Sequence, residues 1–147
     1  MTLRSLMLIT ACCLAFTAGL NAQDSCRSVW ATGTYSTAIN GWATLAANPM
    51  PAVAPITGLG VTTIDFDGSI SGPITTVVAG SPTIYSITGK LTVNPDCTVS
   101  LKVSCAEGCT WEAVGHITRS SKEISLIFTK ANGYPLTATA TLKPLPN

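Results

Sequence analysis

Apolar and polar residues alternate along most of the chain. In the stretch from residue 98 to residue 103, Val99, Leu101 and Val103 share one face, while the polar residues between them share the other. A period of two is typical of a β-strand with one buried and one solvated face. The apolar spacing of an amphipathic helix is not sustained over three turns anywhere after residue 22. The pattern therefore predicts an all-β protein.

The alternation and the turn signals between its runs predict nine short strands. Asn40-Gly41 and Asp67-Gly68 are strong hairpin-turn signals, and interruptions are expected at Gly72-Pro73 and at Gly89. The predicted strands are 28–39, 42–46, 61–66, 69–79, 83–93, 97–104, 110–118, 123–129 and 135–142. Sequential hairpins favour an antiparallel meander, and closure of a long meander into a single β-barrel removes its sheet edges. A β-sandwich is the alternative fold.

The segment Asn48–Gly60 breaks the alternation. It holds three prolines, which argue against a central strand, and the apolar residues Met50, Ala52, Val53, Ile56 and Leu59, which argue against a solvated loop. We expect it to pack over the open end of the barrel and to bury Met50, Val53 and Ile56. Such a segment would control access to whatever the barrel holds.

The N-terminus has the features of a secretory signal peptide. Arg4 precedes an apolar run from Leu6 to Ala18, and Ala22 offers a small residue for cleavage. The prediction is a signal peptide over 1–22 and a single β-barrel domain over 23–147, in a secreted or periplasmic protein. A lipid anchor at Cys12 is a minor alternative. No later segment is long and apolar enough for a membrane helix.

The charge of the chain limits the classes of molecule that the protein is expected to bind. Of 8 Lys+Arg residues, Arg4 lies in the predicted signal peptide, so seven face 7 Asp+Glu residues in the mature chain. A balanced, weakly charged surface supplies no field that would attract nucleic acid. Oligomeric state does not follow from these features.

Four cysteines remain after residue 22, and an even number in an exported chain favours disulfides over a metal site. If Cys97 and Cys105 lie at the ends of one strand, their Cα atoms are about 26 Å apart at about 3.3 Å per residue. A disulfide needs a Cα separation below about 7 Å. The pairing Cys26–Cys97 with Cys105–Cys109 is therefore predicted. The same spacing and compartment argue against a zinc site built from these cysteines and His116.

Three stretches carry a family resemblance, namely Gly33-Thr34-Tyr35-Ser36, Phe66–Gly72 and Leu91–Thr98. They resemble small exported bacterial proteins of unknown function with lipocalin-like or allene oxide cyclase-like barrels. The resemblance implies a barrel and carries over no catalytic residue, because its motifs belong to turns and strands.

Candidate acid–base groups are few. His116 is the only histidine, and a catalytic role would require a partner from another strand, for which Asp65 and Tyr85 are candidates. The alternative for His116 and Asp65 is an ordinary exposed position on a strand. No phosphate-binding loop, nucleophile elbow or HExxH motif occurs in the sequence.

These observations favour a non-enzymatic protein that binds a small apolar ligand in the mouth of the barrel. Met50, Val53, Ile56 and Tyr85 are the predicted ligand-binding residues, and neither a cofactor nor a metal is expected. One alternative is a cofactor-free cyclase or isomerase that uses Asp65, His116 and Tyr85. Another is a surface or interaction protein whose core is filled.

Overall fold

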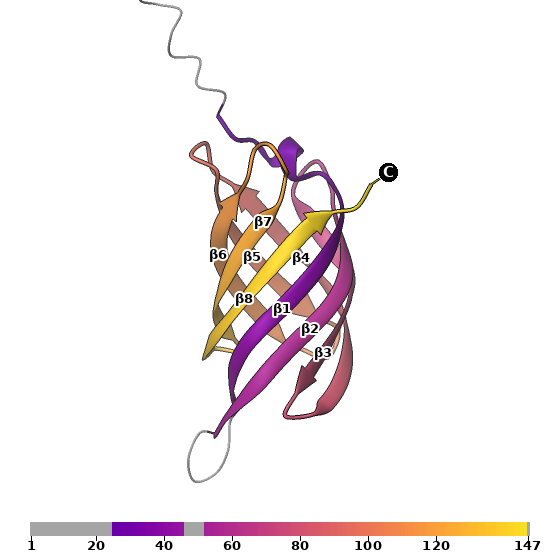
Figure 1. The fold of residues 1–147 in the computed structure, drawn as a ribbon, viewed down its shortest axis with the longest axis vertical. Coiled ribbons are helices and arrows are strands. Elements are labelled where there is room, and N and C mark those ends of the chain that lie inside the picture. The colour runs from indigo at the N-terminus through magenta and orange to yellow at the C-terminus, as the bar shows by residue number, and fades with distance from the viewer. Residues whose placement is uncertain (1–24, 46–51, 147) are drawn as a thin grey trace, which may run out of the picture.

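The computed structural model describes residues 25–45 and 52–146, and within them a short 3-10 helix precedes eight strands (Figure 1). The helix η1 spans Ser28–Ala31. The strands are β1 (Gly33–Leu45), β2 (Ala52–Ile64), β3 (Ser69–Val78), β4 (Ser81–Val93), β5 (Thr98–Cys105), β6 (Thr110–Ile117), β7 (Ile124–Ala131) and β8 (Tyr134–Pro144).

Each strand pairs with the next in antiparallel orientation, and β8 returns to pair with β1. The closing ladder runs from Tyr35 opposite Pro144 to Ala43 opposite Leu136. The predicted antiparallel meander and its closure into a single barrel are therefore confirmed, and the sandwich alternative is wrong. Closure leaves no strand without a partner on both sides.

The barrel interior is a packed apolar core. The predicted inward faces are confirmed. Leu101 of β5, Leu126 of β7 and Leu142 of β8 are buried, whereas the residues on either side of each leucine along its strand are more exposed. Polar groups inside are few. The hydroxyls of Thr37 and Thr62 hydrogen-bond across β1 and β2 at 2.9 Å. The buried Tyr35 hydroxyl has no partner in the described part of the chain, and burial raises its pKa.

The predicted first hairpin is wrong. The chain does not turn at Asn40-Gly41 but continues through it, and the N-terminal part of the predicted strand 28–39 is η1 instead. Gly41 faces inward, where a Cβ atom would collide with the Thr137 carbonyl of β8. Glycine therefore serves the close approach of two strands here, and not a turn.

The prediction that prolines keep Asn48–Gly60 out of the sheet is wrong for residues 52–60, which belong to β2. The Pro55 carbonyl accepts a hydrogen bond from the Ala79 backbone N–H. Because the N–H and C=O of an antiparallel residue point to the same neighbour, the missing N–H of Pro55 faces β3 just beyond its end at Val78. Pro55 thus leaves the ladder with β1 intact. Residues 48–51 lie outside the described residues.

The interruptions expected in two later strands are also absent. β3 passes through Gly72-Pro73, and β4 passes through Gly89 in unbroken register with β5. Pro73 affects only the pairing with β2, where the ladder lapses between Gly60 opposite Ile74 and Thr63 opposite Ser71. Within the described strands, register shifts fall instead between Glu112 and Ala113 and between Phe128 and Lys130.

Both predicted disulfides are confirmed. Cys26 is bonded to Cys97, and Cys105 is bonded to Cys109. The first bridge joins positions 71 residues apart, whereas the second closes a hairpin tip. Within residues 25–45 and 52–146, no helix is long and apolar enough to cross a membrane.

Candidate functional site

The two ends of the barrel differ in construction. At the upper end in Figure 1, η1 lies across the turns that join β2 to β3, β4 to β5 and β6 to β7. Ala31 of η1 is fully buried in the core. The Cys26–Cys97 disulfide fastens this segment to the β4–β5 turn, and the Cys26 N–H donates to the Pro95 carbonyl at 3.1 Å. We call this the closed end.

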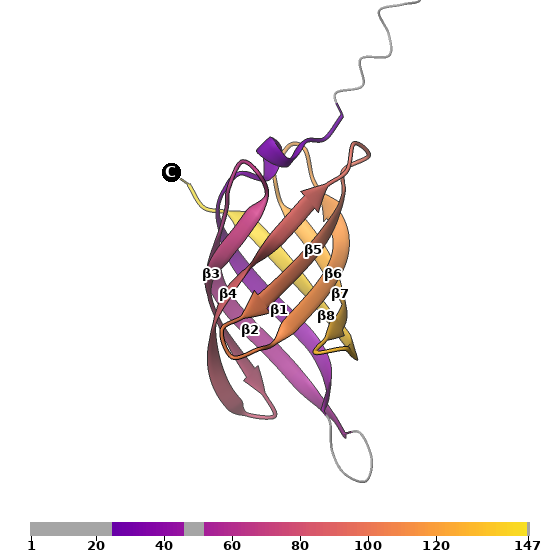
Figure 2. The ribbon, with the colours of Figure 1, turned by 180° about the vertical axis from the view of Figure 1, so that it is seen from behind.

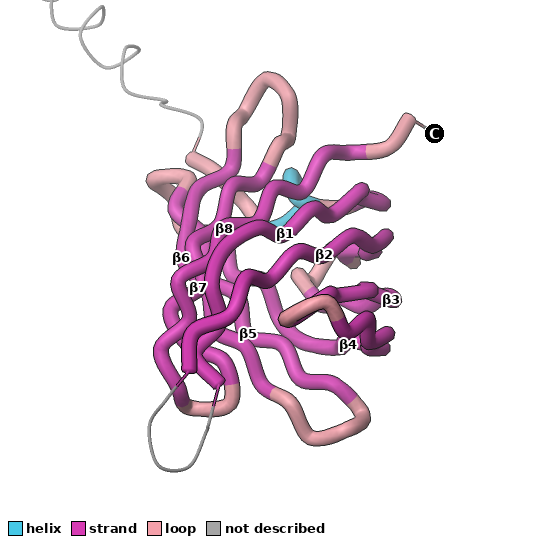
Figure 3. Tube along the Cα trace, turned by 60° about the horizontal axis from the view of Figure 1, so that its bottom comes forward, coloured by secondary structure: helices cyan, strands magenta, loops and turns pink. Residues whose placement is uncertain are grey.

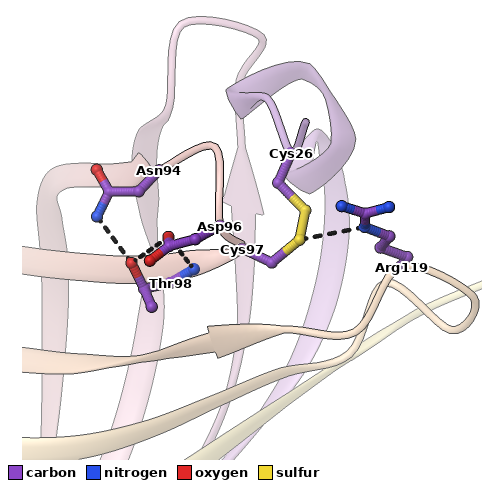
Figure 4. Close-up of a disulfide and its surroundings, with 6 residues drawn as sticks. All are labelled: Cys26, Asn94, Asp96, Cys97, Thr98 and Arg119. Atoms are coloured by element: carbon purple, nitrogen blue, oxygen red, sulfur yellow. Dashed lines mark hydrogen bonds between the residues drawn. A yellow bond between two sulfur atoms is a disulfide. The ribbon is translucent and has the colours of Figure 1, made fainter. Parts of the chain in front are cut away.

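A cation–π contact between Arg119 and Trp30 also lies at the closed end. The Arg119 guanidinium lies 5.7 Å from the centre of the Trp30 ring. Its Nε–H donates to the Cys97 sulfur at 3.3 Å (Figure 4). Arg119 therefore links the β6–β7 turn to η1 and to the disulfide.

In the part of the chain that the structure describes, no helix crosses the opposite end, which we call the open end; it includes the turns that join β3 to β4, β5 to β6 and β7 to β8 (Figure 3). A hollow of about 240 Å³ enters the barrel here. It is lined by residues from seven of the strands or their ends, namely Ala43, Thr44, Ile56, Thr76, Val78, Tyr85, Trp111, Ala131, Asn132 and Leu136. No lining residue carries a charge. We call this the mouth hollow.

Aromatic side chains form the floor of the mouth hollow. The Trp111 ring meets the Tyr85 ring edge to face, with 5.6 Å between centroids, and it meets the Phe128 ring in the same manner at 6.2 Å. Such contacts hold the rings in fixed orientations. The cavities found deeper in the barrel are only about 20 and about 10 Å³. Inside the barrel, room for a ligand is therefore found at the mouth and not in the deeper core.

A few polar groups stand at the rim and wall. The Asn132 side chain is held in place because its Oδ1 accepts a hydrogen bond from the Thr110 backbone N–H at 2.8 Å, and the backbone N–H of Asn132 donates to the Thr110 carbonyl at 2.7 Å. Thr76, which faces inward, adds a hydroxyl group to the wall, and Thr44 also belongs to the lining. The hollow thus presents an aromatic floor, apolar walls and a small number of neutral hydrogen-bonding groups, which is a common composition for small-molecule sites.

The structure brings together two of the four predicted ligand-binding residues. Ile56 and Tyr85 both line the mouth hollow. Val53 lies near the same end of β2, but its side chain is exposed and is not part of the lining. Met50 lies outside the described residues.

The three acid–base candidates are not brought together. Asp65 is exposed in the turn after β2, and His116 is exposed on β6 opposite Thr98. Both lie toward the closed end, whereas Tyr85 lies in the mouth hollow. Within the described residues, no three His, Cys, Asp or Glu side chains gather as a metal site would require.

Of the residues that line the mouth hollow, the sequence pattern pointed to Ile56 and Tyr85 but not to the others. Ala43 was hidden because the predicted turn at Asn40-Gly41 placed it in a different strand. Asn132 lies between the predicted strands 123–129 and 135–142, so the alternation assigned it no face. The sequence did contain a signal for Ala43. If β1 is one strand and Tyr35 faces the interior, every second residue after Tyr35 also faces the interior, and Ala43 is one of these.

Comparison with known proteins shows the fold and no family. No family model and no curated protein matches the chain. One matching solved structure is that of EF1p2_mFAP2b bound to DFHBI, with a TM-score of 0.53 and 11% sequence identity. The match covers 82% of this chain and 100% of that one. At this identity the likeness supports the β-barrel alone, and the resemblance to exported lipocalin-like or allene oxide cyclase-like proteins stays a prediction.

The cysteine chemistry bears on the compartment. Two disulfides in one small domain indicate an oxidising setting, such as the extracellular space or the periplasm.

Proposed function

We propose that this protein binds a small, neutral, largely apolar molecule in the mouth hollow and carries out no chemistry on it. The observation that supports this most is the uncharged hollow of about 240 Å³ above the Trp111 floor. A hollow at the mouth of a β-barrel is a usual location for a small ligand. The contrast with the closed end adds support, because among residues 25–45 and 52–146 a cross-linked helix covers the closed end and no helix covers the mouth.

The size of the hollow limits the ligand. An apolar cavity of about 150 Å³ accommodates benzene. The mouth hollow of about 240 Å³ thus suits one or two fused rings. Tyr85 and Trp111 favour a flat ring packed against an aromatic edge or face, and Thr44, Thr76 or Asn132 can pair with one hydroxyl or carbonyl group. A charged ligand is disfavoured, since no lining residue offers an opposite charge.

The matching barrel supports the proposal only by precedent. EF1p2_mFAP2b is bound to DFHBI, so a protein of similar fold carries a ligand. The cyclase or isomerase alternative has less support. Of its three acid–base candidates, Tyr85 alone lines the mouth hollow.

The test is a pair of alanine substitutions in β1. Ala43→Phe fills the mouth hollow, whereas Ala38→Phe adds the same ring to the outer side of the same strand. With 2-naphthol as a neutral two-ring probe, isothermal titration calorimetry should show affinity reduced at least about tenfold by Ala43→Phe, which corresponds to about 1.4 kcal/mol. Ala38→Phe should leave it unchanged. Equal affinity in both variants would contradict binding in the mouth hollow.

Export by a signal peptide over 1–22 is a further part of the proposal. The mature protein would then begin at Gln23 and form its disulfides after export. Mass spectrometry of the protein recovered from the periplasm or medium tests this. Recovery with residues 1–22 still attached would contradict it.

A further inference from the structure

Charged residues are distributed unevenly around the barrel wall. The sequences of β1, β2 and β3 contain no Asp, Glu, Lys or Arg, and β4 contains only Lys90. Lys90 pairs with Asp67 at 3.2 Å in the turn at the closed end. In contrast, β5, β6, β7 and β8 each carry at least one charge, and Lys102 pairs with Glu112 across β5 and β6 at 3.3 Å.

The uncharged wall also carries large exposed apolar side chains. Leu59 on β2 and Ile84 on β4 are each 68% exposed, and both lie opposite Thr75 of β3. The three residues therefore form a row across the outer surface. Val61, two residues along β2, is exposed as well. We call this area the β2–β4 face; β2, β3 and β4 lie side by side in Figure 2.

Two hollows flank Leu59 on this face. They have volumes of about 490 and about 430 Å³, are open to solvent, and share Leu59 and Thr75 in their linings. Gly60 contributes to the second hollow. It takes an inward position where a Cβ atom would collide with the Pro73 carbonyl, and a glycine at such a position lets the wall bend. The face thus carries the projecting Leu59 side chain beside two hollows, each of which is larger than that side chain.

From this juxtaposition we propose that the β2–β4 face is the contact surface of a symmetric homodimer. A two-fold contact brings the same patch of two copies together, so the patch must be complementary to itself. A patch with net charge would repel its copy, whereas this face is neutral. A ridge beside a hollow is the shape that a two-fold axis near Thr75 can match, with Leu59 of each copy in a hollow of the other.

The available area is adequate for this partner. Together with the adjoining β1, whose Asn40 and Ser36 line the two hollows, the face spans four neighbouring strands. At about 4.8 Å apart and about 33 Å long, they present about 600 Å² in flat projection. Side-chain relief increases that area, and a stable interface needs about 800 Å² per partner. The uncharged composition of the face also fits the centre of an interface, where charged residues are depleted.

The opposite wall supplies a matched control. Ile127 of β7 is 59% exposed and lies opposite Val114 of β6, so it too belongs to an exposed apolar pair. Charged residues lie near this pair, with Glu112 two positions before Val114 and Lys130 three after Ile127. Ile127→Lys and Leu59→Lys therefore make the same change at similar exposure on the two walls.

The test is light scattering and sedimentation of the purified protein over about 1 to about 200 µM, in a range where micromolar dimers dissociate. The wild-type mass should rise to twice that of the monomer, and Ile127→Lys should behave identically. Leu59→Lys should raise the dissociation constant at least about tenfold. Added NaCl should not weaken the dimer, since no ion pair contributes.

A monomer at the highest concentration would overturn the proposal, as would a dimer that survives Leu59→Lys or one that Ile127→Lys disrupts. Hydrogen exchange of the wild type gives an independent reading if Leu59→Lys does not fold. Amides of β2 and β3 should exchange more slowly at high concentration than at low, and those of β6 and β7 should not change. Slowing confined to β6 and β7 would equally overturn it.

Discussion

The two ends of the barrel are made from the same strands but differ in construction. At the closed end, η1, the Cys26–Cys97 bridge and the Arg119–Trp30 contact cover the core. At the open end, the strands stop around a hollow of about 240 Å³ with Trp111 as its floor. The difference is that η1 and the Cys26–Cys97 bridge cover one end, whereas among the described residues no helix covers the other.

The largest expected effect comes from removing the cross-link at the closed end. Cys26→Ser with Cys97→Ser releases a loop of 71 residues and should lower the free energy of unfolding by about 4 kcal/mol. Cys105→Ser with Cys109→Ser releases a far shorter loop at the open end and should cost only about 2 kcal/mol. Urea titration of both double variants measures this. Equal losses would remove the asymmetry between the ends.

The two buried or half-buried tryptophans offer the next comparison. Trp111→Ala removes the floor of the mouth hollow and should cost about 3 kcal/mol of stability, because a large buried side chain is lost. It should also abolish binding of 2-naphthol. Trp30→Ala at the closed end should cost less, since Trp30 is only partly buried, and it should not alter affinity.

Stability is read by urea titration and affinity by calorimetry, so the two effects separate. Trp42, which is 56% exposed on the outer side of β1, provides the control. Trp42→Ala should change neither quantity by much. A loss of affinity in Trp30→Ala but not in Trp111→Ala would reverse the assignment of the two ends.

The fold followed from the sequence because alternation reports local burial. Val99, Leu101 and Val103 alternate cleanly, and each lies in the core as predicted. The predicted hairpin turn at Asn40-Gly41 was wrong because a turn signal depends only on neighbouring residues. The need for a small inward residue near Thr137 comes instead from the register between β1 and β8. Pro55 misled for a similar reason, since its tolerance depends on where β3 ends.

The candidate site was harder to predict than the fold. Its lining comes from seven strands or strand ends, so it depends on the register of the whole barrel and not on any motif. Ile56 and Tyr85 line the mouth hollow, and their ligand-binding role stays a prediction. Val53 was expected to be buried but is exposed, because a strand turns alternate residues outward and Val53 precedes the inward Ala54.

A smaller effect is expected from the cation at the closed end. Arg119→Ala removes the contact with Trp30 and the hydrogen bond to Cys97. The loss of stability should be about 0.5 to 1 kcal/mol, as for an exposed cation–π pair. Lys102→Ala on the outer wall is the control and should cost less, because an exposed ion pair contributes little. Thermal melts compare the two. A larger loss for Lys102→Ala would contradict this account of the closed end.

The smallest effect concerns acid. The backbone N–H and hydroxyl of Ser69, together with Lys90, lower the pKa of Asp67 from 3.8 to about 2. The hydroxyl and backbone N–H of Thr98 lower the pKa of Asp96. A lowered pKa means that the ionised group stabilises the fold. This contribution is complete above the ordinary pKa of 3.8 and is lost as the pH falls through the lowered value.

Both carboxylates lie in closed-end turns, so acid should loosen these turns first. In an NMR pH titration, the Ser69 and Thr98 amides should respond at low pH, while the Asn132 amide at the open end should not. Asp67→Asn should remove the response of Ser69. A Ser69 response centred near the ordinary aspartate pKa would contradict the proposed cause.

The central claim is that the mouth hollow is the binding site, and an NMR titration of the wild-type protein with 2-naphthol tests it most directly. Saturable amide shifts should appear at Ala43, Thr76 and Asn132, around the hollow. Thr98 and Ile117 at the closed end should not move. Shifts centred on the closed end, or none up to the solubility limit of the probe, would contradict the account.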